Sequence, residues 1–351
     1  MVLAGGEGTR LRPLTNTRPK PLLPVLGRPC VEYAIRSLAS AGIEQVFLAC
    51  GYRSADIVAV LGDGKDLGIE LVYAFEDEPA GTAGAVKLLG DKLEGTFVVA
   101  SGDVLVDVDL SEILRLHRDK GAIATIALTE VDTPQEFGIV GLDESSRIIR
   151  FKEKPAPAEV FSNLINAGIY VLQTDVLDYI PDGEKFDFSK NLFPSLLDAG
   201  RPLFGSKLDG LWKDIGRPGD LLEANIKMAA KRGKRIEIEG VSIFGSVCAT
   251  TFSANGAVLE GPLYLGDGVK VGEGTRLSSS AIGSGTVIGK GSEIHGSLVM
   301  DRCNLSDNCI IKGSLIGERC NVGGGVALVN SVLGDGVTLE GPISLEGKTL
   351  E

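Results

Sequence analysis

The sequence predicts two structural parts, an α/β domain with a Rossmann-like, mostly parallel sheet and then a parallel β-helix. The chain has 351 residues, which is enough for two domains that each bury a core. Its first two-thirds alternates short β-rich runs with stretches of helical periodicity. From about Leu259, aliphatic residues recur every 17 positions instead. We therefore expect a catalytic-type domain over 1–232, a linker with a first irregular coil over 233–258, and the β-helix over 259–351.

Strands and helices alternate along the first part. The β-rich runs are apolar enough to be buried on both faces, and they predict strands at 2–4, 44–50, 69–75, 96–103 and 122–131. Apolar residues spaced by three and four predict helices at 31–42, 54–64, 82–93, 110–121 and 217–233, the last ending at a glycine. Ligands of such sheets bind beyond the carboxyl ends of the strands.

Three aliphatic ladders define the second part. Their members are Leu265, Ile282, Val299, Ile316 and Leu333; Val271, Ile288, Leu305, Val322 and Leu339; and Leu277, Ile294, Ile311 and Leu328. One coil of 17 residues with three faces explains all three ladders. Other hexapeptide-repeat proteins imply that the coil is left-handed. Cys303, Cys309 and Cys320 occupy equivalent positions of the 17-residue repeat, so we expect them to be small, inward-facing core residues.

Composition restricts the partners. A formal net charge of −12 argues against broad contact with nucleic acid or an anionic membrane. No apolar run reaches the roughly 18 to 20 residues of a membrane span, and no signal-peptide pattern opens the sequence. Six scattered cysteines do not form a disulfide framework. We expect a cytoplasmic protein.

The opening stretch, LAGGEGTRLRPLTNTRPKPLLPV, combines a glycine-rich turn with cations. Glycines after a short first strand let backbone N–H groups approach a phosphate, and arginine and lysine can neutralise it. Gly8 is followed by Thr9 and Arg10, which excludes a P-loop, and Leu11 excludes a dinucleotide fingerprint. The stretch therefore predicts a site for a small phosphorylated ligand.

This stretch resembles the signature of the sugar-1-phosphate nucleotidylyltransferases. Further family motifs follow in order, namely EPAGTAGAV at 78–86, SGD at 101–103, FG at 137–138, EKP at 153–155, NAG at 166–168 and WKDIG at 212–216. Their combination is most similar to mannose-1-phosphate guanylyltransferases that carry a left-handed β-helix. The resemblance implies transfer of a nucleotidyl group from a nucleoside triphosphate to a sugar 1-phosphate, with GTP and mannose 1-phosphate favoured.

The resemblance also assigns residues to roles. Those implied to hold the nucleotide are Gly5, Gly6, Gly8, Thr9, Gly81 and Thr82, with the last two at the base. Arg10 would stabilise charge on the triphosphate, and Lys20 would draw the α-phosphate toward the attacking oxygen. Asp103 and Asp214 would together ligate Mg²⁺. Gly138, Glu153 and Asn166 would contact sugar hydroxyls, and Lys154 the sugar phosphate.

Several alternatives stay open at this stage. Thymidylyl or uridylyl transfer to glucose 1-phosphate is the second choice of reaction. A catalytically silent regulatory subunit would share the fold, although such a subunit has no need of Arg10, Lys20, Asp103 and Asp214 together. An acyltransferase site on the β-helix would use His295 as a base, but we expect that side chain to face outward at a corner. The flat faces of a β-helix also suit self-association, so we expect a homo-oligomer.

Overall fold

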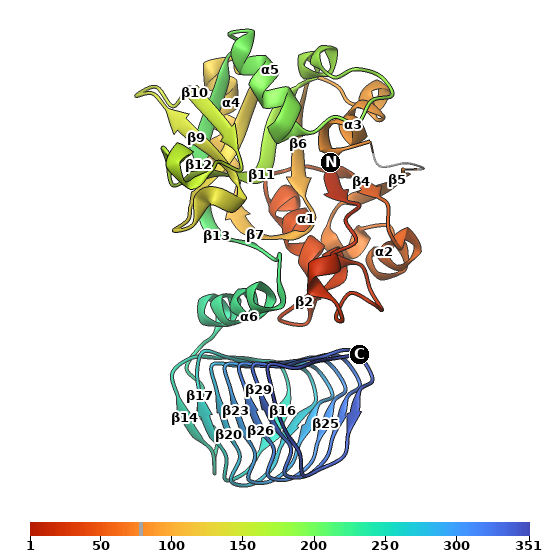
Figure 1. Cartoon of the computed structure of the whole chain (residues 1–351), viewed down its shortest axis with the longest axis vertical. Coiled ribbons are helices and arrows are strands. Elements are labelled where there is room, and N and C mark those ends of the chain that lie inside the picture. The colour runs from red at the N-terminus through yellow and green to blue at the C-terminus, as the bar shows by residue number, and fades with distance from the viewer. Residues whose placement is uncertain (77–79) are drawn as a thin grey trace. The chain divides into compact units, whose positions relative to one another are not determined.

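The computed structural model describes residues 1–76 and 80–351 and forms two compact units (Figure 1). The first unit contains Met1–Gly6 and Val31–Trp212. The second unit contains Glu7–Cys30 and Lys213–Glu351. The cation-bearing stretch after the glycine turn thus belongs to the same unit as the β-helix, although it lies far from the β-helix in sequence.

A mixed sheet forms the centre of the first unit. Its order is β10-β9-β11-β6-β1-β4-β5, and β8 pairs with β11 and with β12. The strands are β1 (Val2–Ala4), β4 (Gln45–Cys50), β5 (Glu70–Phe75), β6 (Thr96–Ser101), β8 (Ala124–Glu130), β9 (Gly138–Leu142), β10 (Ile148–Glu153), β11 (Leu164–Gln173) and β12 (Leu203–Lys207). The predicted α/β class is confirmed. Parallel pairs join β1, β4, β5 and β6, whereas β11 runs antiparallel to β6, β8 and β9.

Helices cover this sheet, and four of them lie where the apolar spacing predicts them: α1 (Cys30–Ser40), α2 (Ser54–Leu61), α3 (Thr82–Lys87) and α4 (Ser111–Lys120). Helix α5 (Phe193–Asp198) was not predicted from the sequence. The helix predicted over 82–93 ends at Lys87 and is followed by a separate 3₁₀ turn, Gly90–Lys92, because glycine favours interruption of a helix. Within residues 1–76 and 80–351, no helix is long and apolar enough to cross a membrane.

His117 connects helix α4 to strands β8 and β11 of the sheet. Its Nδ1 lies 3.0 Å from Thr125 Oγ1 on β8, and its Nε2 lies 2.9 Å from Gln173 Nε2 on β11. Burial lowers the pKa of His117 to about 4, so the ring is neutral at physiological pH. The histidine is therefore a buried packing residue.

Three parallel sheets form the β-helix of the second unit. The first sheet contains β14 (Ser242–Phe244), β17 (Val258–Glu260), β20 (Arg276–Ser278), β23 (Glu293–His295), β26 (Ile310–Lys312), β29 (Ala327–Val329) and β32 (Ser344–Glu346). The second contains β15 (Val247–Ala249), β18 (Leu263–Leu265), β21 (Ala281–Ile282), β24 (Leu298–Val299), β27 (Leu315–Ile316), β30 (Val332–Leu333) and β33 (Thr349–Leu350). The third contains β16 (Phe252–Ala254), β19 (Val269–Val271), β22 (Val287–Ile288), β25 (Asn304–Leu305), β28 (Asn321–Val322) and β31 (Thr338–Leu339).

The three predicted ladders coincide with the strand register. Leu265 pairs with Ile282, Val271 with Ile288, and Leu277 with Ile294, and each ladder continues coil by coil. The first coil starts at Ser242, inside the segment expected to hold an irregular coil. Ser242 pairs with Val258 and Val247 pairs with Leu263, both at an interval of 16 residues, and Leu259 pairs with Leu277 at an interval of 18. These departures from 17 residues hide the first coil in the sequence.

Small side chains fill the interior corners as predicted. Cys303, Cys309 and Cys320 are buried in the β-helix core and carry free thiols. The Cys303 thiol donates to Gly317 O at 2.9 Å, and the Cys320 thiol donates to Gly334 O at 3.1 Å. The interpretation of these cysteines as core residues is confirmed.

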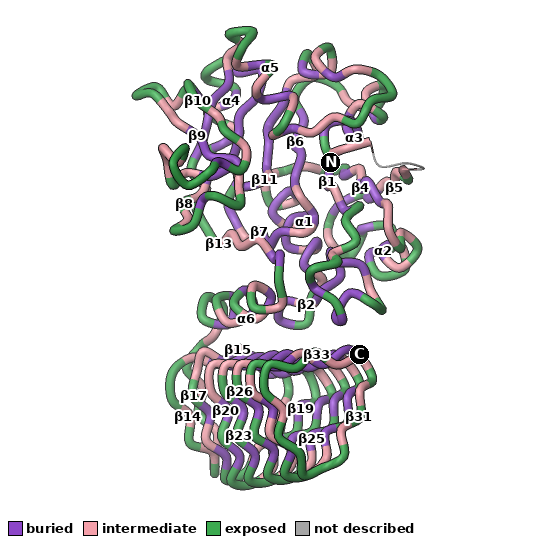
Figure 2. The backbone as a smooth tube through the Cα atoms, in the orientation of Figure 1, coloured by how far each residue is buried: buried purple, intermediate pink, exposed green. Residues whose placement is uncertain are grey.

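One face of the β-helix is covered by other parts of its own unit. Helix α6 (Pro218–Arg232) contacts β15, β18 and β21. Leu298 and Leu315 precede inward-facing residues and so point outward, yet they are only 4% and 3% exposed. Figure 2 shows the β15–β33 face as largely buried. This face is therefore an internal packing surface of the second unit.

Candidate active site

The carboxyl ends of β1, β4 and β6 meet at one edge of the mixed sheet. Ala4 pairs with Cys50, and Leu3 pairs with Ser101, so the loops after these strands are neighbours. Gly5 and Gly6 follow β1 and are exposed. A Cβ added at Gly51 would lie 3.2 Å from Gly5 O, which shows how closely the backbones approach. The predicted glycine turn thus opens at the edge where ligands bind in such sheets.

Asp103 lies in the turn that follows β6. Ser101 Oγ donates to Asp103 Oδ1 at 2.7 Å, and the carboxylate is half-buried. Gly168 has φ +74, and a Cβ there would lie 3.2 Å from Ser101 Cβ. A glycine is needed at this point because both the conformation and the close approach disfavour a side chain. The NAG stretch therefore passes directly beside the turn that holds Asp103.

The residues assigned to the sugar are brought together by β9, β10 and β11. Glu153 pairs with Gly138, and a Cβ at Gly138 would lie 2.8 Å from Glu153 Oε2. Asn166 Nδ2 donates to Tyr170 OH at 3.0 Å and to Ser189 Oγ at 2.9 Å. Asn166 Oδ1 accepts the N–H of Gly168 at 2.9 Å, so the amide is fixed in orientation. Gly138, Glu153 and Asn166 thus form one polar group, called the sugar-side group below.

Glu153 of this group is affected both by burial and by nearby charges. Burial raises the pKa of Glu153, while the charges of Lys154 and Lys190 oppose that rise. Lys154 has φ 44, a left-handed conformation that costs energy for a residue with a Cβ. Its backbone N–H donates to Phe137 O at 3.0 Å, and its side chain is exposed. Strain of this kind is concentrated at functional sites.

Gly81 and Thr82 lie at the amino-terminal end of helix α3. Gly81 has φ +80, and a Cβ there would lie 2.6 Å from Phe186 O. The backbone N–H and the hydroxyl of Thr82 both donate to Asp187 Oδ1, at 3.2 and 3.3 Å. Glu78 and Pro79 of the same sequence motif lie outside the described residues.

The segment 186–189 was not identified from the sequence. Asp187 accepts hydrogen bonds from Thr82, and Ser189 accepts one from Asn166. This segment therefore connects the start of α3 with the sugar-side group. It leads into a short π-helix, Phe188–Leu192, a feature frequently seen at functional sites. No spacing in the sequence relates residue 187 to residue 82, so only the folded chain reveals the link.

Trp212 packs beside the sugar-side group. Its Nε1 donates to Ala167 O at 2.8 Å, and its ring meets Phe137 edge-on at 5.9 Å between centroids. Both partners are immediate neighbours of predicted site residues. Trp212 is therefore a packing residue.

Gly8 and Lys20 lie against each other in the second unit. Gly8 has φ +66, and a Cβ there would lie 2.8 Å from Lys20 Cβ. Thr15 Oγ1 donates to Gly8 O at 2.9 Å, which closes the loop between them, and Thr9–Leu11 forms a 3₁₀ turn. Lys20 is 7% exposed, and its Nζ lies 3.7 Å from Asp214 Oδ1. A buried ammonium is thus held at the glycine turn next to a carboxylate.

Arg10 reaches the same place. A Cβ added at Gly216 would lie 3.4 Å from Arg10 Nη2 and 3.1 Å from Asp214 Oδ2. Arg10, Lys20 and Asp214 are therefore grouped within the second unit, and they are called the cation group below. Asp103 belongs to the first unit.

Arg18 does not belong to this group. Its guanidinium forms ion pairs with Glu318 and Asp335 on the β-helix. Its charge is therefore compensated within the protein.

Comparison with known proteins identifies the family. The model of the nucleotidyl transferase family matches residues 1–231, and that of the EIF2B subunit epsilon LbH domain matches residues 232–345. This chain belongs to the nucleotidyl transferase family. The UTP--glucose-1-phosphate uridylyltransferase of Synechocystis sp. is 36% identical over 79% of this chain and 76% of that protein. The mannose-1-phosphate guanylyltransferase of Mycobacterium tuberculosis is 35% identical over 80% and 79%.

Further relatives agree with this assignment. The mannose-1-phosphate guanyltransferase of Saccharomyces cerevisiae is 36% identical over 70% of both chains. Among solved structures, a putative glucose-1-phosphate thymidylyltransferase from Bacillus anthracis matches with a TM-score of 0.59 and 29% identity. That match covers 64% of this chain and 92% of the other. The chain is a sugar-1-phosphate nucleotidyltransferase with a left-handed β-helix, and both expectations from the sequence are confirmed.

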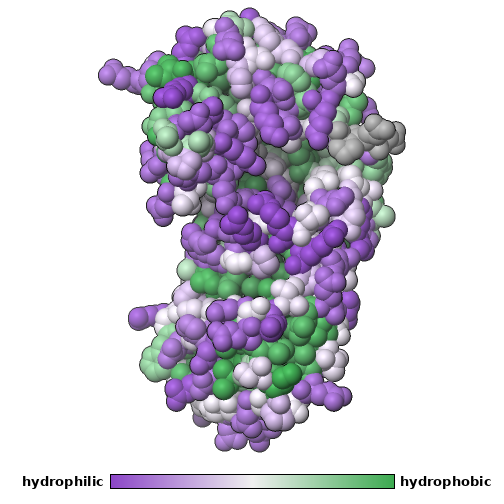
Figure 3. All heavy atoms as spheres, in the orientation of Figure 1, coloured by the Kyte–Doolittle hydropathy of each residue, from purple (hydrophilic) through white to green (hydrophobic). Residues whose placement is uncertain are grey.

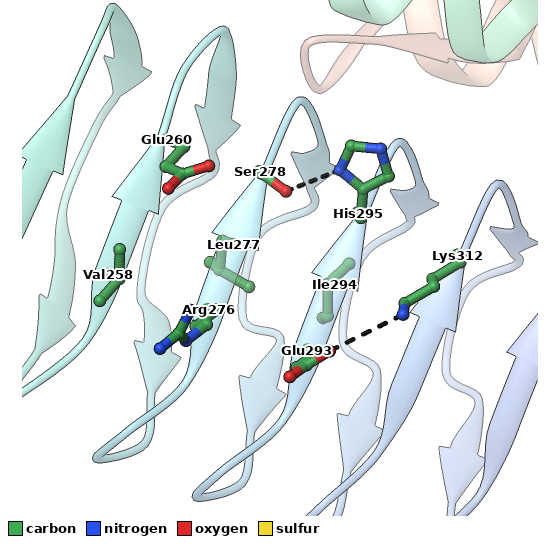
Figure 4. A pocket seen from close by; sticks show the side chains of 9 residues that line it. All are labelled: Val258, Glu260, Arg276, Leu277, Ser278, Glu293, Ile294, His295 and Lys312. Carbon is green, nitrogen blue, oxygen red and sulfur yellow. Dashed lines mark hydrogen bonds and ion pairs between the residues drawn. The ribbon is translucent and has the colours of Figure 1, made fainter.

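Polar side chains of the nucleotidyltransferase also gather on the first sheet of its β-helix (Figure 4). A pocket of about 330 Å³ there is lined by residues that include Glu293, His295 and Lys312. His295 is exposed, and its Nδ1 lies 2.8 Å from Ser278 Oγ. His295 faces outward as predicted, but it is the last residue of strand β23, and the corner follows at Gly296.

The uncovered surface of the β-helix mixes polar and apolar side chains (Figure 3). Phe244, Val287 and Ile310 are 59%, 38% and 39% exposed. Self-association through this surface stays a prediction, which the molar mass from light scattering tests.

Proposed function

We propose that this chain transfers the guanylyl group of GTP to mannose 1-phosphate, giving GDP-mannose and pyrophosphate. The cation group carries the proposal, because a buried lysine and an arginine beside a glycine turn suit a triphosphate. The names of the relatives support the choice of substrates, since mannose-1-phosphate guanylyltransferases from bacteria, archaea and eukaryotes are similar to this chain.

The reaction needs no protein nucleophile. A phosphate oxygen of the sugar 1-phosphate attacks the α-phosphorus of the nucleotide, a new phosphoanhydride bond forms, and the bond to the β-phosphate breaks as pyrophosphate leaves. The enzyme has to align two polyanions and reduce their repulsion. In the proposal, Lys20 holds the α-phosphate and Arg10 stabilises charge on the departing pyrophosphate. Gly5, Gly6, Gly8 and Thr9 hold the phosphates.

The remaining residues orient the two substrates. Gly81 and Thr82 contact the base. The sugar-side group forms hydrogen bonds with sugar hydroxyls, and Lys154 binds the sugar phosphate. Because the amide of Asn166 is fixed by Gly168 and Ser189, it discriminates between hydroxyl positions more sharply than a mobile side chain.

We propose that Mg²⁺ is the cofactor of this reaction. Asp103 and Asp214 supply carboxylate oxygens, the hard ligands that Mg²⁺ prefers, and the ion usually completes its shell with substrate phosphates and water. When bound, Mg²⁺ would neutralise charge on the α-phosphate. This assignment is tested by measuring activity after a chelator has removed the metal ion, and again after MgCl₂ has been added back.

Pyrophosphate release with MgCl₂ across a grid of substrates tests the proposal. The grid pairs GTP, UTP, dTTP, ATP and CTP with mannose, glucose and N-acetylglucosamine 1-phosphates. We expect the maximum at GTP with mannose 1-phosphate. A maximum at UTP with glucose 1-phosphate would instead support the second candidate, which the Synechocystis relative favours. No release in any cell of the grid would overturn the proposal.

A further inference from the structure

A half-buried ion-pair cluster joins the signature stretch to the β-helix within the second unit. Arg18 Nη1 lies 2.5 Å from Glu318 Oε1, and Arg18 Nη2 lies 2.5 Å from Asp335 Oδ2. The hydroxyl of the preceding residue, Thr17, also donates to Asp335 Oδ2 at 2.5 Å. The three charged side chains are 15%, 15% and 3% exposed. We call Arg18, Glu318 and Asp335 the Arg18 clasp.

The carboxylates of the clasp are themselves fixed. Asp335 Oδ1 accepts the backbone N–H of Glu318 at 2.7 Å, across neighbouring coils. Glu318 Oε2 lies 3.0 Å from Arg302 Nη2. Burial disfavours the charge of Arg18, but hydrogen bonds and the charges of the two carboxylates outweigh that effect and raise its pKa. The guanidinium therefore meets a rigid receptor that keeps it ionised.

Two further contacts hold the same stretch on the β-helix. A Cβ added at Gly334 would lie 3.1 Å from Pro13 Cβ, and one added at Gly27 would lie 2.5 Å from Tyr264 OH. The clasp lies between these points along the chain. The stretch is thus supported on both sides of Lys20.

Only Pro19 separates Arg18 from Lys20. Pro19 has φ −71 and ψ 152, and its ring fixes φ, so the path from the clasp to Lys20 has little freedom. We infer that Arg18 is a positioning residue for the reaction, and that the β-helix, through Glu318 and Asp335, holds Lys20 at the place where the α-phosphate binds. The inference rests on the proposed role of Lys20. It gives the β-helix a part in the chemistry of the nucleotidyl transfer.

Replacement of Arg18 tests this role against a matched control. In Arg18→Met the charge is lost while length and apolar contacts remain. We expect kcat to fall about tenfold or more, because Lys20 acts on the transition state, with the KM for the sugar 1-phosphate changed less than threefold. Lys290→Gln removes an exposed ion pair to Glu273, elsewhere on the β-helix, and should leave kcat within twofold of wild type. Arg18→Lys should recover part of the loss. Equal effects of Arg18→Met and Lys290→Gln would overturn the inference.

A double-mutant cycle separates positioning from general stability. In a chain that already carries Lys20→Ala, Arg18→Met should lower kcat by less than twofold further, because it acts through Lys20. Additive losses in the double variant would overturn the inference. Glu318→Gln combined with Asp335→Asn keeps most of the hydrogen-bond acceptors and serves where Arg18→Met fails to fold. That pair should reproduce the loss of kcat, and wild-type kcat would contradict the clasp.

Hydrogen exchange distinguishes failure of this inference from failure of the proposed function. Arg18→Met should speed amide exchange in residues 11–23, and exchange in the β-helix coils at 276–312 should stay unchanged. If exchange is faster in Arg18→Met but the wild-type protein shows no activity, the proposed reaction is wrong and the clasp is still supported. Unchanged exchange would overturn the clasp, whichever substrates the enzyme uses.

Discussion

At the scale of single residues, Gly8 and Lys20 require each other. A side chain at residue 8 would meet Lys20 Cβ at 2.8 Å, and φ +66 disfavours any residue with a Cβ. Lys20 is buried there because its Nζ reaches the Asp214 carboxylate. A charge kept so far from water has to be compensated, and a bound phosphate adds a second anion.

Lys20→Met should lower kcat about 100-fold, because removal of one charged group that stabilises the transition state costs about this much. The melting temperature should change by only a few degrees, since the methionine fills the same space. Lys213→Met is the matched control, because Lys213 pairs with Asp220 and Glu223 nearby in the chain. Steady-state pyrophosphate release measures both variants, and similar kcat values would contradict the role of Lys20.

Glu153→Gln should raise the KM for the sugar 1-phosphate about tenfold, because a charge-assisted hydrogen bond is lost. The same change should stabilise the fold at neutral pH. Burial raises the pKa of Glu153, so the folded state holds its proton more tightly than the unfolded chain. The stability that this group contributes is present below its ordinary pKa near 4.5 and is lost as pH rises through the higher, folded value.

Melting curves of wild type and Glu153→Gln at pH 4 and pH 7 check the sign. The variant should melt higher at pH 7, and the difference should shrink at pH 4. Glu159→Gln is the control, because Glu159 is exposed and its pKa is lowered by its hydrogen bond to Ala156 and by Lys152. It should leave the KM unchanged. A lower melting temperature for Glu153→Gln at pH 7 would contradict the argument.

At the scale of elements, a ladder of serines joins successive coils of the β-helix. Its members are Ser280, Ser297, Ser314 and Ser331, which are all buried. Each hydroxyl donates to a carbonyl two residues earlier and accepts the backbone N–H of the residue 17 positions later. The corners between strands break the regular ladder of backbone bonds, and these hydroxyls satisfy the groups left over.

Ser297→Ala should lower the free energy of unfolding by about 1 to 3 kcal/mol, because it leaves the buried N–H of Ser314 without this acceptor. Ser344→Ala is the control, since Ser344 is exposed on β32. Urea denaturation of both variants measures the difference. A midpoint of Ser297→Ala equal to that of the control would show that the ladder adds nothing.

The direction of β11 is a second feature at this scale. Because β11 runs antiparallel to β6, its amino-terminal half lies at the edge where β1 and β6 end. Gly168 thereby reaches Ser101, beside the turn of Asp103. In an all-parallel sheet this half would lie at the opposite edge, so the mixed topology places part of the candidate site.

At the scale of the whole molecule, sequence domains and compact units divide the chain differently. The stretch 7–30 precedes most of the α/β domain in sequence, yet it belongs to the unit of the β-helix. Helix α6 contacts the second sheet of the β-helix, and Pro13 and Gly27 of this stretch lie against Gly334 and Tyr264. The β-helix is therefore more than an appended platform.

A chain that ends at residue 232 should lose more than 90% of the activity and should aggregate. Its α6 and its stretch 7–30 would expose apolar surface to water, and Arg18 would lose both carboxylates. Size-exclusion chromatography and the pyrophosphate assay measure both effects against the full chain. A monomeric, fully active 1–232 fragment would contradict this account.

The sequence by itself determined the features that depend on local or periodic spacing. The coils of the β-helix follow from a 17-residue interval, since every inward residue has its partner at a fixed offset. The glycine turn, the cations and most strands and helices were likewise predictable, because backbone conformation and apolar periodicity act over few residues. The family motifs then identified candidate site residues in both units.

Only the tertiary structure decided which distant side chains meet. Nothing in the sequence relates Ser189 to Asn166, or Arg18 to carboxylates 300 and 317 positions away. Such pairs have no period, because each depends on how whole elements pack and on which polar groups burial leaves to be satisfied. For that reason the role of Arg18 was not predictable from the sequence, and only the folded chain makes it the link between the β-helix and Lys20.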